Sequence, residues 1–132
     1  MNNRPDGADL LRVARKLLRE ELAELIPREQ RYEALMVANA MAIAERESEA
    51  GDRDLQEELR MLTELYGEEA AGRAGTGLRE KVANLNRRLA KDIRAGVLDG
   101  ACAPGVRVLL KAQVLARLRI SNPKYLKTMG QE

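Results

Sequence analysis

The hydrophobic pattern of the chain is strongest over residues 34–44, where the sequence Ala-Leu-Met-Val-Ala-Asn-Ala-Met-Ala-Ile-Ala is apolar at every position except Asn39. At about 100° per residue these side chains cover the whole circumference of a helix, and a helix that is apolar all round is expected to be buried. The run is too short to span a bilayer, which requires about 20 such residues. We therefore expect a helix over about residues 28–50 to form the buried centre of the protein.

Four further segments show the 3.6-residue periodicity of helices. The short turn at Pro27 predicts that the first of them is antiparallel to the central helix. The last is nearly apolar all round, with only a narrow polar strip. The four segments cover about residues 6–25, 54–66, 78–95 and 104–120. The expected fold is all-α, a five-helix up-down bundle that forms a single domain over residues 1–132.

Two segments are expected to lie outside the packed helices. Residues 67–77, Gly-Glu-Glu-Ala-Ala-Gly-Arg-Ala-Gly-Thr-Gly, are interpreted as a flexible linker. A phosphate-binding loop is disfavoured, because no strand precedes these glycines and no Gly-Lys-Ser/Thr follows them. Residues 127–132 are expected to be disordered, as the ends of a chain often are.

Composition limits the chemistry that the chain can perform. It contains no His, Phe or Trp, and Cys102 is its one cysteine. Without His or a second Cys the usual ligand sets for zinc, haem or di-iron sites are missing, and so are the groups of Ser-His and Cys-His catalysis. We predict no catalytic residue, no metal and no cofactor. An enzyme that uses carboxylates alone, with Glu21 as acid or base, is a minor alternative.

Charge is distributed unevenly along the chain. Residues 1–76 carry 11 basic and 17 acidic side chains, whereas residues 77–132 carry 12 basic and 4 acidic side chains. The two halves should attract one another, within one chain or between two copies. The alternative is a basic face that binds an anionic ligand through Arg87, Arg88, Lys91, Arg107 and Lys111. Nucleic-acid binding is less favoured, because no aromatic side chains are interleaved with these cations.

Two nearly all-apolar helices are more than one small bundle can cover. We expect a second subunit to bury part of one of them, with a homodimer as the favoured assembly. The N-terminal Met-Asn-Asn-Arg-Pro-Asp has no apolar leader, and neither end carries a lipidation motif. A bacterial-type cytoplasmic location without membrane contact is therefore expected.

Glu21 is the polar residue that least fits its predicted surroundings. On a helical projection it lies among Leu10, Leu17 and Leu25, on the side of the first helix that the pattern predicts to be buried. An unpaired buried carboxylate is costly, so a partner is expected. Folding the chain about Pro27 brings Arg31 and the Tyr32 hydroxyl within reach. We interpret the pair as structural.

Other polar residues are also interpreted as structural. Asn39, in the centre of the expected buried helix, should be hydrogen-bonded and should fix the register of its neighbours, with ligand recognition as the alternative. Arg46 is expected to approach Asp9 when the chain folds about Pro27. Arg94 and Asp99 flank the turn that follows residue 95, and an ion pair between them would fix it.

Several fragments in this order resemble a family of small bacterial all-helical domains of unknown function. They are Arg4-Pro5 before a Leu-rich helix, Tyr32 to Glu47, Leu85-Asn86, Ile93-Arg94-Ala95-Gly96, Leu98-Asp99 and Asn122-Pro123-Lys124-Tyr125-Leu126. The resemblance covers nearly the whole chain. The segment 67–77 and the turn at Pro27 depart from the commoner pattern.

The resemblance implies an accessory role but no catalytic residue. Members of that family are found beside, or fused to, phosphotransferases of the aminoglycoside-phosphotransferase and choline-kinase type, often near acyl-CoA dehydrogenases. The leading hypothesis is therefore a non-enzymatic, homo-oligomeric interaction protein that associates with a phosphotransferase-like protein or an acyl-CoA dehydrogenase. The alternative is a module that binds an acyl-CoA or another phosphorylated anion in the basic C-terminal half.

Overall fold

The computed structural model describes residues 3–73 and 75–130, and within them it contains helices and no strand. The predicted all-α class is confirmed, and five helices are longer than seven residues. The chain divides into two compact units, Met1–Gly51 and Asp52–Glu132, which are described separately below. The single domain and the single five-helix bundle stay predictions. No helix of the described residues has both the length and the apolarity that a bilayer span requires.

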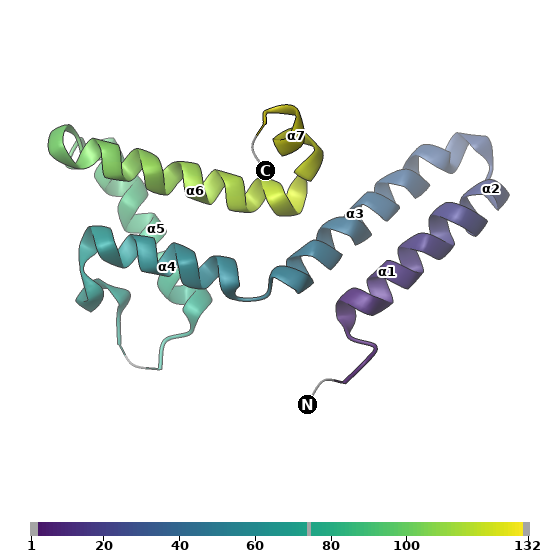
Figure 1. Ribbon diagram of the computed structural model, residues 1–132, viewed down its shortest axis with the longest axis horizontal. Coiled ribbons are helices and arrows are strands. Elements are labelled where there is room, and N and C mark those ends of the chain that lie inside the picture. The colour runs from purple at the N-terminus through teal and green to yellow at the C-terminus, as the bar shows by residue number, and fades with distance from the viewer. Residues whose placement is uncertain (1–2, 74, 131–132) are drawn as a thin grey trace. The chain divides into compact units, whose positions relative to one another are not determined.

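The first unit is a helical hairpin (Figure 1). Its first arm consists of α1 (Gly7–Leu17), a π-helical turn η1 (Leu18–Leu22) and α2 (Ala23–Leu25). Its second arm consists of a 3₁₀ turn η2 (Arg28–Gln30) and α3 (Arg31–Ala50). Ile26 is extended because it precedes Pro27, so the first arm ends there. The predicted antiparallel packing of the two arms is confirmed.

The π turn shifts the register of the first arm. Buried or half-buried side chains occur along this arm at Ala8, Leu11, Arg15, Leu18, Ala23 and Ile26. The step from Leu18 to Ala23 is five residues, as a π turn requires, rather than the three or four of an α-helix. As a result Ala23 is half-buried, whereas Leu22 and Leu25 are exposed.

The prediction that residues 28–50 form a helix buried on several sides is wrong. In α3 only one stripe is buried, Ala34, Ala38, Ala42 and Glu45. The reason is that a hairpin gives α3 one neighbouring arm, which the small alanine side chains allow to approach closely. The rest of the apolar circumference lies outside this contact, and most of its large side chains are exposed.

The second unit contains the large-residue core. Its long helices are α4 (Arg53–Tyr66), α5 (Leu78–Ala95) and α6 (Ala103–Ser121), and α4 packs on both of the others. Leu62 is 0% exposed, and the buried side chains around it are Val82, Leu85, Leu89, Leu98, Val106 and Leu109. Gly96 ends α5 in the left-handed conformation that glycine adopts without strain. The predicted second apolar helix, α6, buries Val106 and Leu109 and exposes Val108 and Val114.

The segments between and after these helices are partly helical. Residues 67–77 include the 3₁₀ helix η3 (Glu68–Ala71), which contacts α4 and α5, while Ala74 lies outside the described residues. The flexibility of this segment stays a prediction. The turn η4 (Gly100–Cys102) leads into α6. After α6, α7 (Pro123–Thr128) is capped by the Asn122 side chain. The disorder expected for residues 127–132 stays a prediction. Residues 131–132 lie outside the described residues.

Candidate interaction surface

A buried carboxylate joins the two arms of the hairpin. The Glu45 side chain is 9% exposed, and each of its oxygens accepts a hydrogen bond. Arg12 Nε donates to Oε1 at 2.9 Å, and Arg15 Nη2 donates to Oε2 at 2.9 Å. Arg12 also donates to Asp9 at 3.2 Å and to Glu49. Because both oxygens accept hydrogen bonds from guanidinium groups, neither is left unpaired at this buried contact.

The ion pairs that the structure describes in the hairpin centre on Arg12, Arg15 and Glu45. Asp9 pairs with Arg12, and the expected approach of the half-buried Arg46 to Asp9 stays a prediction. The residues that the sequence analysis missed are Arg12, Arg15 and Glu45. Folding about Pro27 brings these positions opposite one another, which is the signal that would have found them. The two arginines lie off the leucine stripe of α1, which is the side that the hydrophobic pattern predicts to be buried.

The predicted burial of Glu21 is also wrong. Glu21 is exposed, as is Arg31, the partner expected for it. Its neighbours on the projection, Leu10, Leu17 and Leu25, are exposed too. The helical projection therefore correctly placed these residues in one common environment. That environment is solvent, because α3 packs against the adjacent side of α1.

The remaining structural polar residues are likewise exposed. Asn39 faces away from the α1 contact, so its predicted burial is wrong. Arg94 and Asp99 are both exposed. The turn between them is held by backbone hydrogen bonds, with the N–H of Val97 donating to the carbonyl of Asp92 at 3.1 Å.

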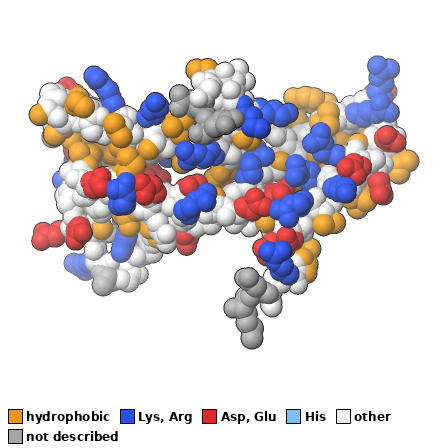
Figure 2. Space-filling view, viewed as in Figure 1, with side chains coloured by type: hydrophobic (Ala, Val, Ile, Leu, Met, Phe, Trp, Pro, Cys, Tyr) orange, Lys and Arg blue, Asp and Glu red, His pale blue; other side chains and the backbone are white. Residues whose placement is uncertain are grey.

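Two apolar faces of the hairpin are exposed. The α1 face consists of Leu10, Val13, Leu17, Leu22 and Leu25, which are 43–80% exposed. The α3 face consists of Tyr32, Leu35 and Met36, which lie on one side of the helix and are 54–70% exposed. Val37 is 48% exposed but lies on another side of α3. In Figure 2 hydrophobic side chains reach the surface at the end of the hairpin where α2 and α3 meet. Large apolar side chains gathered on a small unit are typical of a surface that binds another molecule.

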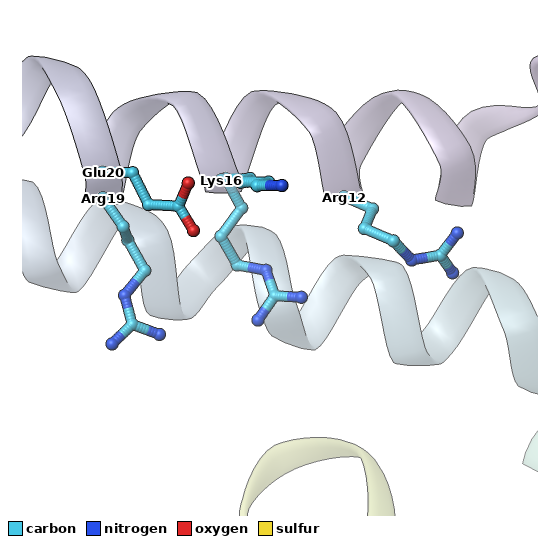
Figure 3. Close-up of a pocket in the computed structure, with 5 residues that line it drawn as sticks. Arg12, Lys16, Arg19 and Glu20 are labelled. Carbon is cyan, nitrogen blue, oxygen red and sulfur yellow. The ribbon is translucent and has the colours of Figure 1, made fainter.

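Cations line one side of the first arm. Arg12, Lys16, Arg19 and Glu20 lie along this side (Figure 3), and Arg15 lines the same concave surface. The Nε atom of Arg15 is buried and has no hydrogen-bond partner among the described residues, although its Nη2 atom bonds Glu45. Arg12 and Arg15 are thus engaged with α3, and the side chains of Lys16 and Arg19 carry positive charge at the edge of the α1 face.

The five cations proposed from sequence as an anion site are all exposed on α5 and α6. Arg87 donates to the Asn84 side chain. Arg88 stacks 4.1 Å above the Tyr66 ring and lies 3.7 Å from Asp92. Lys91, Arg107 and Lys111 complete the set. The described contacts therefore give Arg88 a structural position rather than a position in a ligand site.

The structure shifts the pKa of Tyr66 through burial and a hydrogen bond. Its hydroxyl donates to Asp92 Oδ2 at 2.7 Å. Burial raises the pKa of Tyr66 to about 12, with the hydrogen bond to the Asp92 carboxylate and its charge acting in the same direction. Arg88 opposes this shift. Tyr66 thereby joins the end of α4 to α5.

A polar chain that the sequence analysis missed links the three long helices of the second unit. Gln113 on α6 donates to Asn86 Oδ1 at 2.8 Å, and Asn86 on α5 donates to Glu58 on α4 at 2.7 Å. Glu58 and Gln113 also line a cavity between α4 and α6, together with Met61, Leu115 and others. Each amide is satisfied by its neighbours, so the chain fixes the register of the helices.

Comparison with known proteins gives a family and no activity. A family model described as a domain of unknown function (DUF6285) matches residues 23–125. No curated protein matches the chain, and no solved structure matches it. The match begins in α2 and ends in α7, so it covers α3 and the whole large-residue core.

Proposed function

Because the chain belongs to the DUF6285 family, whose function is unknown, we propose its function from its surface: a non-enzymatic helical accessory protein that docks on another protein. The observation that carries this proposal is the α3 face, where three large apolar side chains within five residues are 54–70% exposed. The same helix uses small alanines to contact α1. Its large side chains are therefore left available for a partner.

The α3 face has the composition of a docking helix. Tyr32 combines a large apolar ring with a polar hydroxyl, and side chains of this kind are enriched in the centres of interfaces. Met36 is flexible and adapts to irregular partner surfaces. A helix of this kind binds by placing its apolar side in a groove of its partner. The free energy of such binding comes mainly from removing these side chains from water.

The proposed partner is a phosphotransferase of the aminoglycoside-phosphotransferase and choline-kinase type, or an acyl-CoA dehydrogenase, in the bacterial cytoplasm. The resemblance noted from the sequence supports this choice, because it implies an association with proteins of these two kinds. The accessory protein would then contribute binding, while the partner performs the reaction.

The test is to mix the protein with a phosphotransferase of the aminoglycoside-phosphotransferase and choline-kinase type, or with an acyl-CoA dehydrogenase, from the same organism and to measure the mass of the complex by light scattering. Met36→Glu should weaken the complex at least tenfold, because it places an unpaired charge in the buried contact. Val114→Glu is the matched control, since Val114 on α6 is exposed to the same degree, and it should leave binding unchanged. The docking function would be rejected if neither the phosphotransferase nor the dehydrogenase binds.

Binding of an acyl-CoA or another phosphorylated anion by the basic C-terminal half is the alternative. The described contacts favour it less, since Arg88 is held by Tyr66 and Asp92. Thermal-shift measurements with CoA esters separate the two proposals. No stabilisation at millimolar ligand would eliminate the alternative and leave the docking proposal intact.

A further inference from the structure

We propose that a second copy of this chain covers the α1 face, with the first arm of one hairpin antiparallel to the first arm of the other about a two-fold axis beside Leu18. This proposal shares with the docking function only the premise that exposed apolar faces bind partners. It concerns the α1 face, and it leaves the α3 face free for a different protein.

In the sequence of the first arm, residues at equal distances before and after Leu18 have complementary side chains. Reading outward from Leu18, positions at equal distance carry either two apolar side chains or two opposite charges. The apolar pairs are Leu11 with Leu25, Val13 with Ala23 and Ala14 with Leu22, and the charged pairs are Arg12 with Glu24, Arg15 with Glu21 and Lys16 with Glu20. One pair, Leu17 with Arg19, departs from this rule. Such a pattern favours antiparallel association of two identical helices, because Lys16 then meets Glu20 of the other copy, while Arg12 and Arg15 remain bound to Glu45.

The same alignment brings the exposed leucines together. In an antiparallel pair centred on Leu18, Leu10 of one copy lies level with residues 25–26 of the other, and Ala14 lies level with Leu22. Leu17 lies close to Leu17 of the second copy, about 3 Å from it along the helix axis at 1.5 Å per residue. Leucines therefore meet leucines or the small Ala14.

The π turn keeps these leucines on one side of the arm. In a continuous α-helix, the eight residues from Leu17 to Leu25 would rotate the side chain about 80° away from its starting direction. The wider turn over Leu18–Leu22 absorbs one extra residue and removes most of that rotation. Leu10, Leu17 and Leu25 consequently form one exposed stripe.

Charge at the edge of the stripe sets the direction of pairing. Arg12 and Arg15 are already bound to Glu45, whereas Lys16 lies with Glu20 along the side of the arm seen in Figure 3. In the antiparallel pair Lys16 lies level with Glu20 of the second copy, and Glu20 with its Lys16. A parallel pair would place like charges together. A two-fold contact also needs only one self-complementary patch.

The first test is the mass of the full-length protein in solution, measured by light scattering at high micromolar concentration. We expect a dimer. Leu17→Arg should convert it to a monomer, because two guanidinium groups would meet at the two-fold axis. Val108→Arg alters an exposed valine of the second unit and should leave the dimer intact. A monomeric wild-type protein, or a dimer that survives Leu17→Arg, would overturn the proposal.

The second test determines which residues of the two first arms lie opposite one another in the dimer. In a Cys102→Ala background, which removes the exposed native thiol, Leu17→Cys should form a disulfide-linked dimer on oxidation. Leu10→Cys should not, since the two copies of residue 10 would lie about 24 Å apart, far beyond the reach of a disulfide. A mixture of Leu10→Cys and Leu25→Cys proteins should form the mixed dimer. Equal cross-linking by Leu10→Cys and Leu17→Cys would reject this register.

The two proposals fail separately. If the wild-type protein is monomeric because another part of the same chain covers the α1 face, Leu17→Cys will give no cross-linked dimer. The phosphotransferase would still bind, and its complex would still be weakened by Met36→Glu. If the dimer forms but neither partner protein binds, the docking function fails and the self-association stands.

Discussion

The two units of the chain are held together in different ways. The second unit buries leucines and valines from α4, α5 and α6, with Leu62 at its centre. In the hairpin the buried side chains are four alanines and one carboxylate, Glu45. Burial of a large aliphatic side chain contributes about 1.5–3 kcal/mol, and an alanine contributes much less. The second unit thus supplies its own hydrophobic core, whereas the hairpin depends on close helix approach and paired charge.

This difference explains where apolar surface remains exposed. Alanines along the contact allow α1 and α3 to approach, but they bury little apolar area. The leucines of α1 and the large side chains of α3 point elsewhere. A hairpin of this construction gains further stability when another helix covers those faces. The weaker unit is therefore the one suited to binding.

The largest expected effect lies in the second unit. Leu62→Ala should lower the free energy of unfolding by about 3 kcal/mol, because it removes a fully buried side chain and leaves a cavity. Urea unfolding followed by circular dichroism measures this change. The matched substitution in the hairpin, Leu35→Ala, removes the same atoms from an exposed position and should change stability by less than about 0.5 kcal/mol. Equal effects would remove the distinction between the units.

The next effect tests whether ion pairing holds the hairpin. Glu45→Gln keeps the size of the side chain but removes its charge, and Arg12 and Arg15 lose their shared anion. We expect a loss of about 2 kcal/mol, less than for a fully buried pair because Arg12 is half exposed. Glu49→Gln breaks an exposed pair with the same arginine and should cost at most about 1 kcal/mol. Equal losses in the two variants would show that burial of Glu45 is unimportant.

These ion pairs mark the limit of what could be predicted from the sequence. Periodicity and breaker residues correctly predicted the five long helices, the turn at Pro27 and the antiparallel hairpin. Those features depend on neighbouring residues only. Which side of α1 packs in the hairpin depends on α3. The residues of α3 are apolar around its whole circumference, so their pattern does not show which side of α3 contacts α1.

The sequence predicted an excess of apolar helix surface, but it did not predict which residues would be exposed. The excess of apolar helix surface could be counted from the sequence, and the α3 face is part of it. Burial of Glu21 and Asn39 could not be judged, because it depends on which stripe pairs. The stripe of α3 that contacts α1 consists of small alanines and Glu45. A π turn, which periodicity does not predict, places Leu22 and Leu25 at the surface.

A third prediction concerns the close approach of the two arms. Ala38 is buried at the α1 contact, so Ala38→Leu should force the helices apart and lower the free energy of unfolding by about 1–2 kcal/mol. Ala40, two residues further along, is exposed, and Ala40→Leu should be close to neutral. Thermal unfolding of the two variants compares the sides of α3 directly. Destabilisation by Ala40→Leu alone would mean that the packing face has been misassigned.

The smallest expected effect belongs to the polar link between α4 and α5. Tyr66→Phe removes the hydroxyl that donates to Asp92 and should lower the free energy of unfolding at neutral pH by about 1 kcal/mol. The aromatic ring remains, so Arg88 keeps its stacking contact. Denaturant unfolding of the wild type and the variant measures the difference.

The pH dependence of that difference distinguishes the hydrogen bond from simple packing. The pKa of Tyr66 is raised from 10.0 in its ordinary state to about 12 in the folded protein. The unfolded chain therefore releases this proton first, and between pH 10 and pH 12 it binds fewer protons than the folded chain. The stabilisation is fully present below pH 10 and is lost as the pH rises toward 12, so the wild type should lose stability over this interval more steeply than Tyr66→Phe. If the two proteins instead keep a constant difference up to pH 12, folding does not raise the pKa of Tyr66, and its hydroxyl is not held in a buried hydrogen bond to Asp92.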